Sequence, residues 1–116
     1  MDIKIIDGIA VINSETPIIS DAQAALDLIA SVSYEHDVNK IAINKAAVNE
    51  DFFKLSTGLA GDVAQKFVNY GCRLAIFGDF SAYTSKPLRD YMYECNKGKD
   101  LCFAADEAEA LRNLSK

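Results

Sequence analysis

The sequence predicts an α/β fold: a mixed sheet with a parallel core, extended at the N-terminus by an antiparallel hairpin. Short apolar runs of strand length alternate with longer segments of helical periodicity, in the order β-β-α-β-α-β-α-β-α. Right-handed crossovers through the helices make the later strands parallel. The hairpin is predicted where Asp7-Gly8 separates residues 3–6 from residues 9–12, because a type I′ turn needs two residues with positive φ.

The first helix and the later strands each have a local signal. Ser20-Asp21-Ala22-Gln23 resembles a capping box, and it predicts a helix that begins there and ends near Tyr34. The inward face of this helix is expected at helical spacing: Ala22, Ala25, Leu26, Ile29 and Val32. Three short apolar runs are typical of strands covered on both faces: residues 40–44, 73–77 and 101–104.

Three further helices are marked by residues that favour helix ends. They begin after Gly58, after Ser85-Lys86-Pro87 and at Asp106-Glu107, while Gly71 and Gly98 end the first two. The residues expected to face the core are Leu59, Val63 and Phe67, then Leu88, Tyr91, Met92 and Cys95, and finally Ala108, Leu111 and Leu114. No repeat, low-complexity tract or linker interrupts the pattern, so residues 1–116 are interpreted as one domain.

The composition excludes several classes of function. Lysine and arginine number 12 and aspartate and glutamate 17, which gives a net charge of −5, so no basic surface for nucleic acid is expected. No apolar run approaches the ~20 residues that span a bilayer, and the N-terminus has no secretory signal. We therefore expect a cytoplasmic protein that binds neither nucleic acid nor membrane.

Cysteine and histidine are too few to indicate a metal centre. Cys72, Cys95 and Cys102 are irregularly spaced, which favours reduced thiols over a disulfide framework. His36 is the only imidazole, and no pair of cysteines has the spacing of a zinc site. No glycine-rich nucleotide-binding motif occurs either. The sequence therefore predicts neither a metal nor a cofactor.

The order of elements and several segments resemble the STAS domain, which occurs in bacterial anti-sigma-factor antagonists and in the cytoplasmic tails of sulfate transporters. Residues 40–44 correspond to the strand before its regulatory loop, and Leu55-Ser56-Thr57-Gly58-Leu59 is similar to the Asp-Ser-Ser-Gly-Leu segment that begins its second helix. Residues 71–76 and 104–114 resemble its glycine-then-strand step and its ending. The resemblance implies a regulatory domain without catalysis that binds a protein partner.

The same resemblance implies a phosphorylation switch. In anti-sigma antagonists a partner kinase phosphorylates the serine just before the helix glycine, and this abolishes binding to that partner. Thr57 stands at this position, between Ser56 and Gly58, and the partner surface would comprise residues 44–59. Two departures from the family pattern are Leu55 in place of aspartate and threonine in place of serine. The simpler interpretation is that Ser56 or Thr57 only caps the helix.

A second resemblance covers nearly the whole chain. The sequence is similar to a small bacterial family called domain of unknown function 4180. The segments that carry the similarity are residues 50–53, 57–61, 65–70, 78–81, 83–86 and 94–98. This resemblance is more specific than the first, and it implies no activity.

The carboxyl ends of the predicted parallel strands form another candidate surface, because open α/β sheets bind ligands there. The polar and charged residues expected at this edge are Asn44, Lys45, Asp79, Ser81, Thr84, Ser85, Lys86 and Arg89. They suggest, as an alternative function, a binder of small anions or a minor enzyme. Helix capping beside a solvated basic patch is the simpler interpretation. The shortage of catalytic residues favours a protein without enzymatic activity.

Overall fold

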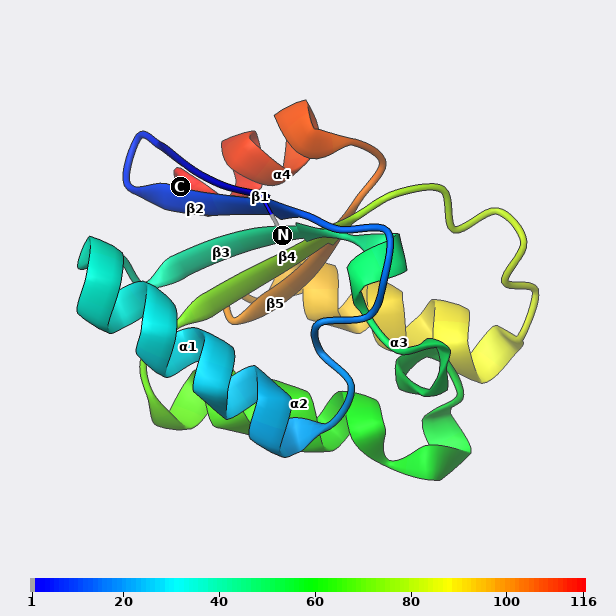
Figure 1. The fold of residues 1–116 in the computed structure, drawn as a ribbon. Helices are drawn as coiled ribbons and strands as arrows, with labels where there is room; N and C mark the ends of the chain where they lie inside the picture. Colours follow the sequence, from blue (N-terminus) through cyan, green and yellow to red (C-terminus); the bar gives the residue numbers. More distant parts are fainter. Residues whose placement is uncertain (1) are drawn as a thin grey trace.

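A five-stranded sheet is the centre of the computed structural model, which describes residues 2–116 (Figure 1). The strands are β1 (Asp2–Ile6), β2 (Ile9–Asn13), β3 (Lys40–Asn44), β4 (Arg73–Phe77) and β5 (Leu101–Ala104). Their order in the sheet is their order in the chain. β1 is antiparallel to β2, and β2 to β5 are parallel, so the predicted mixed sheet is confirmed.

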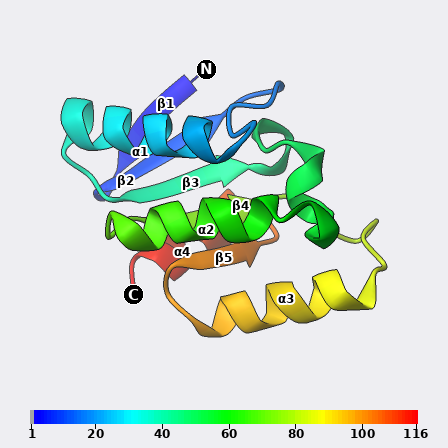
Figure 2. The ribbon, with the colours of Figure 1, turned by 90° about the horizontal axis from the view of Figure 1, so that it is seen from below.

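Four helices cover the two faces of the sheet. They are α1 (Ala22–His36), α2 (Leu59–Asn69), α3 (Lys86–Lys97) and α4 (Glu107–Leu114). α1, α2 and α3 lie on one face, and α4 lies on the other (Figures 1 and 2). The three helices share a face because each connects two neighbouring parallel strands by a crossover in the same direction. As a result, the connections that leave the carboxyl ends of the strands gather at one edge of the sheet.

Alternating side chains along the strands supply a core on each face of the sheet. In β3, Ile41 and Ile43 belong to the core under α1, α2 and α3, whereas Ala42 belongs to the core under α4. Ala42 and its partner in β4, Ala75, are completely buried. These small side chains allow α4 to pack closely against the middle of the sheet.

Local turn signals in the sequence are confirmed at two places. Asp7 and Gly8 both have positive φ, 51° and 76°, as a type I′ hairpin turn requires. Gly71 has φ of 61°, and the N–H of the following residue, Cys72, donates to the carbonyl of Phe67 at 2.9 Å. This 6→1 hydrogen bond is the mark of a Schellman motif, in which a left-handed glycine ends the helix.

The ends of α1 differ from the prediction. Asp21, not Ser20, is the N-cap residue, because its carboxylate accepts a hydrogen bond from the N–H of Ala24 at 2.7 Å. The capping-box prediction was therefore wrong by one residue. The helix also continues two residues past Tyr34 to His36, and Asp37 ends it in the left-handed conformation with φ of 54°.

The inward faces of two helices differ from the predicted ones. In α1, Leu28 is buried and Leu26 is only half-buried, since Leu28 follows Ala25 by three residues on the buried face. In α4, Ala108 is exposed and Ala110 is buried, four residues before the buried Leu114. The inward faces predicted for α2 and α3 are confirmed at their most buried positions: Val63, Phe67 and Leu88.

Candidate functional site

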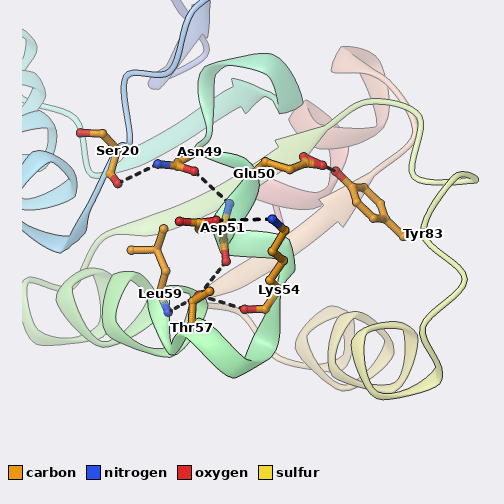
Figure 3. Close-up of polar contacts among 8 residues, drawn as sticks. All are labelled: Ser20, Asn49, Glu50, Asp51, Lys54, Thr57, Leu59 and Tyr83. Carbon is orange, nitrogen blue, oxygen red and sulfur yellow. Dashed lines mark hydrogen bonds and ion pairs between the residues drawn. The ribbon is translucent and has the colours of Figure 1, made fainter.

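The connection between β3 and α2 runs along the carboxyl edge of the sheet as three short 3₁₀ turns, at Lys45–Ala47, Glu50–Phe53 and Leu55–Thr57. We call it the β3–α2 segment. Asn49 fastens it: its side-chain oxygen accepts from the N–H of Asp51 at 2.9 Å, and its amide donates to the carbonyl of Ser20 at 3.3 Å (Figure 3). Phe52 and Phe53 are buried beneath the segment. Hydrogen bonds of Asn49 and the buried phenylalanine rings therefore hold the exposed polar residues of the segment in place.

Thr57 closes this segment and begins α2. Its hydroxyl donates toward the carbonyl oxygens of Asp51 and Lys54, at 2.7 and 2.9 Å, and accepts from the N–H of Leu59 at 3.2 Å (Figure 3). The helix N-cap itself is Gly58, which has φ of 77° and no side chain to cap the helix. Thr57 supplies the missing acceptor, so the predicted capping contact exists. Thr57 and the neighbouring Ser56 are both exposed to solvent.

Tyr83 attaches the loop after β4 to the β3–α2 segment. Its phenol donates to the carboxylate of Glu50, 2.7 Å from Oε2 and with Oε1 also in contact (Figure 3). Its ring stacks on Phe53, with centroids 4.9 Å apart and planes 19° from parallel. The ammonium of Lys45 lies 4.9 Å from the ring centroid. The ring, the hydroxyl and a nearby cation thus hold two connections together at the carboxyl edge.

The electrostatics around Tyr83 keep its hydroxyl protonated. Burial, followed by the hydrogen bond to Glu50 and the charge of Glu50, raises the pKa of Tyr83 well above its ordinary value. The phenol is therefore a hydrogen-bond donor at neutral pH and not a base. The sequence prediction missed the contact between Glu50 and Tyr83, because it spans 33 residues and follows no local period. The only signal was the presence of two aromatic residues, Phe80 and Tyr83, in the loop after β4.

Two of the predicted ligand-binding residues hold the backbone. The side chain of Asn44 accepts from the N–H of Ser14 at 2.9 Å and donates to its carbonyl at 2.7 Å, so it fixes the connection after β2. Asp79 accepts from the N–H of Ser81 at 2.9 Å. Hydrogen bonds from Ser81 lower the pKa of the Asp79 carboxyl, and the positive charge of Lys45 adds a smaller effect.

The predicted residues around the start of α3 also have structural partners. Ser85 is the N-cap, and its hydroxyl oxygen accepts from the N–H of Leu88 at 3.5 Å. Lys86 pairs with Asp90 at 2.8 Å, and this contact raises the pKa of the Lys86 ammonium. Asp90 therefore favours the charged form of Lys86. Thr84 is exposed to solvent.

The structure brings together only some of the predicted residues. Arg89 donates to the carbonyl of Tyr83 at 3.4 Å, and with Ser81, Tyr83 and Phe80 it lines an open hollow of about 270 Å³. A second open hollow of about 520 Å³ lies beside Asp79 and Phe80. Lys45 approaches the ring of Tyr83. By contrast, the side chain of Asn44 is hydrogen-bonded to Ser14, and that of Lys86 is paired with Asp90.

The described residues also bear on metal ligation and on cysteine pairing. Within residues 2–116, no group of three histidine, cysteine, aspartate or glutamate side chains is placed to hold a metal ion. Cys72, Cys95 and Cys102 are free thiols.

Within residues 2–116, no helix has the length and apolar character that crossing a membrane requires.

Comparisons with known proteins place the chain in one family. Searches of curated proteins and of solved structures gave no match. The family described as "Domain of unknown function (DUF4180)" matches residues 6–114. The match runs from the last residue of β1 to the last residue of α4, and it includes the β3–α2 segment and the loop that carries Tyr83. The chain therefore belongs to the DUF4180 family.

Proposed function

We propose that this chain is a STAS-like regulatory module without catalysis, which binds a protein partner through residues 44–59. Phosphorylation of Thr57 controls this binding. The element order behind the resemblance to STAS domains supports the proposal, as does the position of the β3–α2 segment before α2.

The hydroxyl of Thr57 carries the proposal. It is exposed, and its one hydrogen is directed at the carbonyls of Asp51 and Lys54, at 2.7 and 2.9 Å. A kinase that transfers the γ-phosphoryl group of ATP to this oxygen releases ADP and the hydroxyl proton. The oxygen then has no hydrogen to donate, and it bears a group with a charge of about −1.5 to −2. Both carbonyl contacts are lost.

The surroundings of Thr57 explain how the loss of these two hydrogen bonds changes the shape of the surface. The added charge meets two carbonyl oxygens and the nearby carboxylate of Asp51, which pairs with Lys54 at 3.8 Å. The first turn of α2 instead offers free N–H groups and the positive end of the helix dipole. We expect the phosphate to turn toward α2 and the Leu55–Thr57 turn to open. A partner that recognises the closed turn then dissociates.

A crosslinking experiment tests binding and its control together. A photoreactive phenylalanine replaces Ser56, which is exposed beside Thr57, and the protein is irradiated in its native cells. We expect one protein adduct, reduced about tenfold by Thr57→Glu and retained in Thr57→Ser. Thr84→Glu is the matched control, because Thr84 is an exposed threonine in a different loop. Loss of the adduct in both glutamate variants, or in neither, contradicts the proposal.

A second candidate function is binding of a small anion beside Tyr83. Lys45 and Arg89 both approach this residue, and the ion pairs found within residues 2–116 involve neither cation. Inorganic phosphate is the simplest probe. Thermal stabilisation by phosphate that is lost in Lys45→Ala and Arg89→Ala but kept in Lys86→Ala favours this function. Equal stabilisation of all four proteins excludes a site at this place.

A further inference from the structure

A cavity of about 270 Å³ lies at the opposite edge of the sheet, between α1, the residues that precede β3 and the turn that joins α2 to β4. We call it the α1–α2 cavity. The buried side chains of Ile29 and Cys72 contribute to its lining, together with the partly buried Leu26 and Val38. Its lining also includes two exposed aromatic residues, Tyr34 and Tyr70.

From this cavity we infer a binding site for a small, uncharged aromatic molecule. The exposure of the two tyrosines is the first argument. Tyr34 is 93% exposed and Tyr70 is 60% exposed, although both adjoin an apolar hollow that is open to solvent. Aromatic rings left in water beside an apolar cavity are typical of binding sites, since a ligand that enters buries both.

The lining determines the charge of the ligand. Among residues 2–116, no lysine, arginine, aspartate, glutamate or histidine lines the cavity. Burial raises the pKa of the Cys72 thiol to about 11, so this side chain is also neutral at physiological pH. A charged ligand would lose water here without gaining a counter-charge, which is unfavourable. Polar groups are nevertheless present: Ser33 and Asn39 supply a hydroxyl and an amide, and the tyrosines supply phenols.

The volume of the cavity and its aromatic residues determine the size and shape of the ligand. A volume of about 270 Å³ is below the ~300–1,000 Å³ of pockets for drug-sized ligands, so it suits one or two fused rings. Aromatic ligands pair with tyrosine rings in stacked or edge-on geometry and gain more than burial alone provides. The ligand is thus a small planar ring system with one or two polar atoms.

This site is separate from the proposed partner surface. Thr57 precedes the first residue of α2, whereas Tyr70 follows its last residue. The 11 residues of the helix between them span roughly 16 Å. Thr57 and the α1–α2 cavity therefore lie at opposite ends of α2.

Indole is a suitable probe because the chain has no tryptophan, so indole fluorescence is observed without a tryptophan background. We expect saturable binding with a dissociation constant on the order of 1 mM, as for a ligand of this size. Amide chemical shifts should change in residues 26–39 and 70–72. Indole-3-acetate, which carries a carboxylate, should bind at least about fivefold more weakly.

A filling substitution locates the site. Ala30 is exposed and lines the cavity, so Ala30→Phe places a ring there without disturbing the core. We expect about tenfold weaker indole binding. Ala108→Phe, at an exposed alanine of α4, is the matched control and should bind indole as the wild type does. Absence of saturable binding, shifts elsewhere, or equal affinities of the two variants overturns the site. Equal binding of indole and indole-3-acetate overturns its selectivity for uncharged ligands.

Discussion

The phenol of Tyr83 donates a hydrogen bond to the carboxylate of Glu50, 2.7 Å from Oε2, and so joins two connections that lie 33 residues apart in the chain. Tyr83→Phe removes the donor and leaves the stacked ring in place. Because both groups retain contact with solvent, we expect the free energy of unfolding to fall by about 1 kcal/mol. Urea denaturation measures this loss. Tyr93→Phe, at an exposed tyrosine of α3, should change stability much less, and equal losses would contradict the assigned role.

The same phenol makes stability depend on alkaline pH. The pKa of Tyr83 is raised in the folded chain, so the unfolded chain loses this proton first, near the ordinary value of 10.0. The contribution to stability is complete below that pH and falls as the pH rises toward the folded-state pKa. Between about pH 9 and 11, the wild type should therefore lose more stability than Tyr83→Phe. Parallel stability curves would refute this linkage.

Arg73 joins the start of β4 to the end of α4. Its Nε donates to the carbonyl of Lys99 at 2.8 Å, and its two terminal nitrogens donate to carbonyls of Asn113 and Leu114 at 3.2 and 3.1 Å. Lysine cannot reproduce this fork, so Arg73→Lys should cost about 1–2 kcal/mol and increase hydrogen exchange in α4. Arg112→Lys, at an exposed position of α4, is the control. Unchanged exchange in Arg73→Lys would show that the fork is dispensable.

The capping role of Thr57 predicts a simple series of variants. Thr57→Val keeps the shape of the side chain but removes the acceptor for the N–H of Leu59 and the donor to Asp51. We expect a loss of about 1 kcal/mol, as for other helix caps. Thr57→Ser keeps the hydroxyl and should stay within about 0.5 kcal/mol of the wild type. Thermal unfolding distinguishes the two, and a serine variant as unstable as the valine variant would contradict the capping role.

Two glycines of similar surroundings should respond in opposite ways to alanine. A Cβ at either Gly61 or Gly71 would meet nothing within 4 Å, so only the backbone decides. Gly61 lies inside α2, where alanine should stabilise the helix by about 1 kcal/mol. Gly71 has φ of 61°, where alanine should destabilise by about 1 kcal/mol. Denaturant titrations of the two variants should therefore move in opposite directions from the wild type, and a shared direction would argue against this account.

The sequence allowed the elements to be predicted because their signals are local. Asp7-Gly8 determines a turn from two adjacent residues, and Gly71 ends a helix through bonds to the preceding turn. The start of α1 was misplaced by one residue because Ser20 and Asp21 are both good capping residues. Only the geometry determines whose oxygen reaches the N–H of Ala24.

The contacts at the candidate sites could not be predicted in the same way. Asn44 meets Ser14 across 30 residues, and its role in holding a loop gives no pattern in the sequence. A polar residue at the end of a strand therefore resembled a ligand-binding residue, although its hydrogen bonds hold the backbone of Ser14. The tyrosines beside the α1–α2 cavity likewise come together only because two helices end at the same edge of the sheet.

The order of the strands also has a consequence for folding. Every strand of the sheet pairs with its nearest neighbours along the chain, so no strand must wait for a later one before it can pair with the strand that precedes it. Each βα unit closes a loop of moderate length, and loop-closure entropy then rises only slowly as strands are added. Such a topology has a modest relative contact order, and mixed α/β domains of this kind fold faster than sandwiches. The sheet can therefore grow strand by strand in the order in which the chain is synthesised.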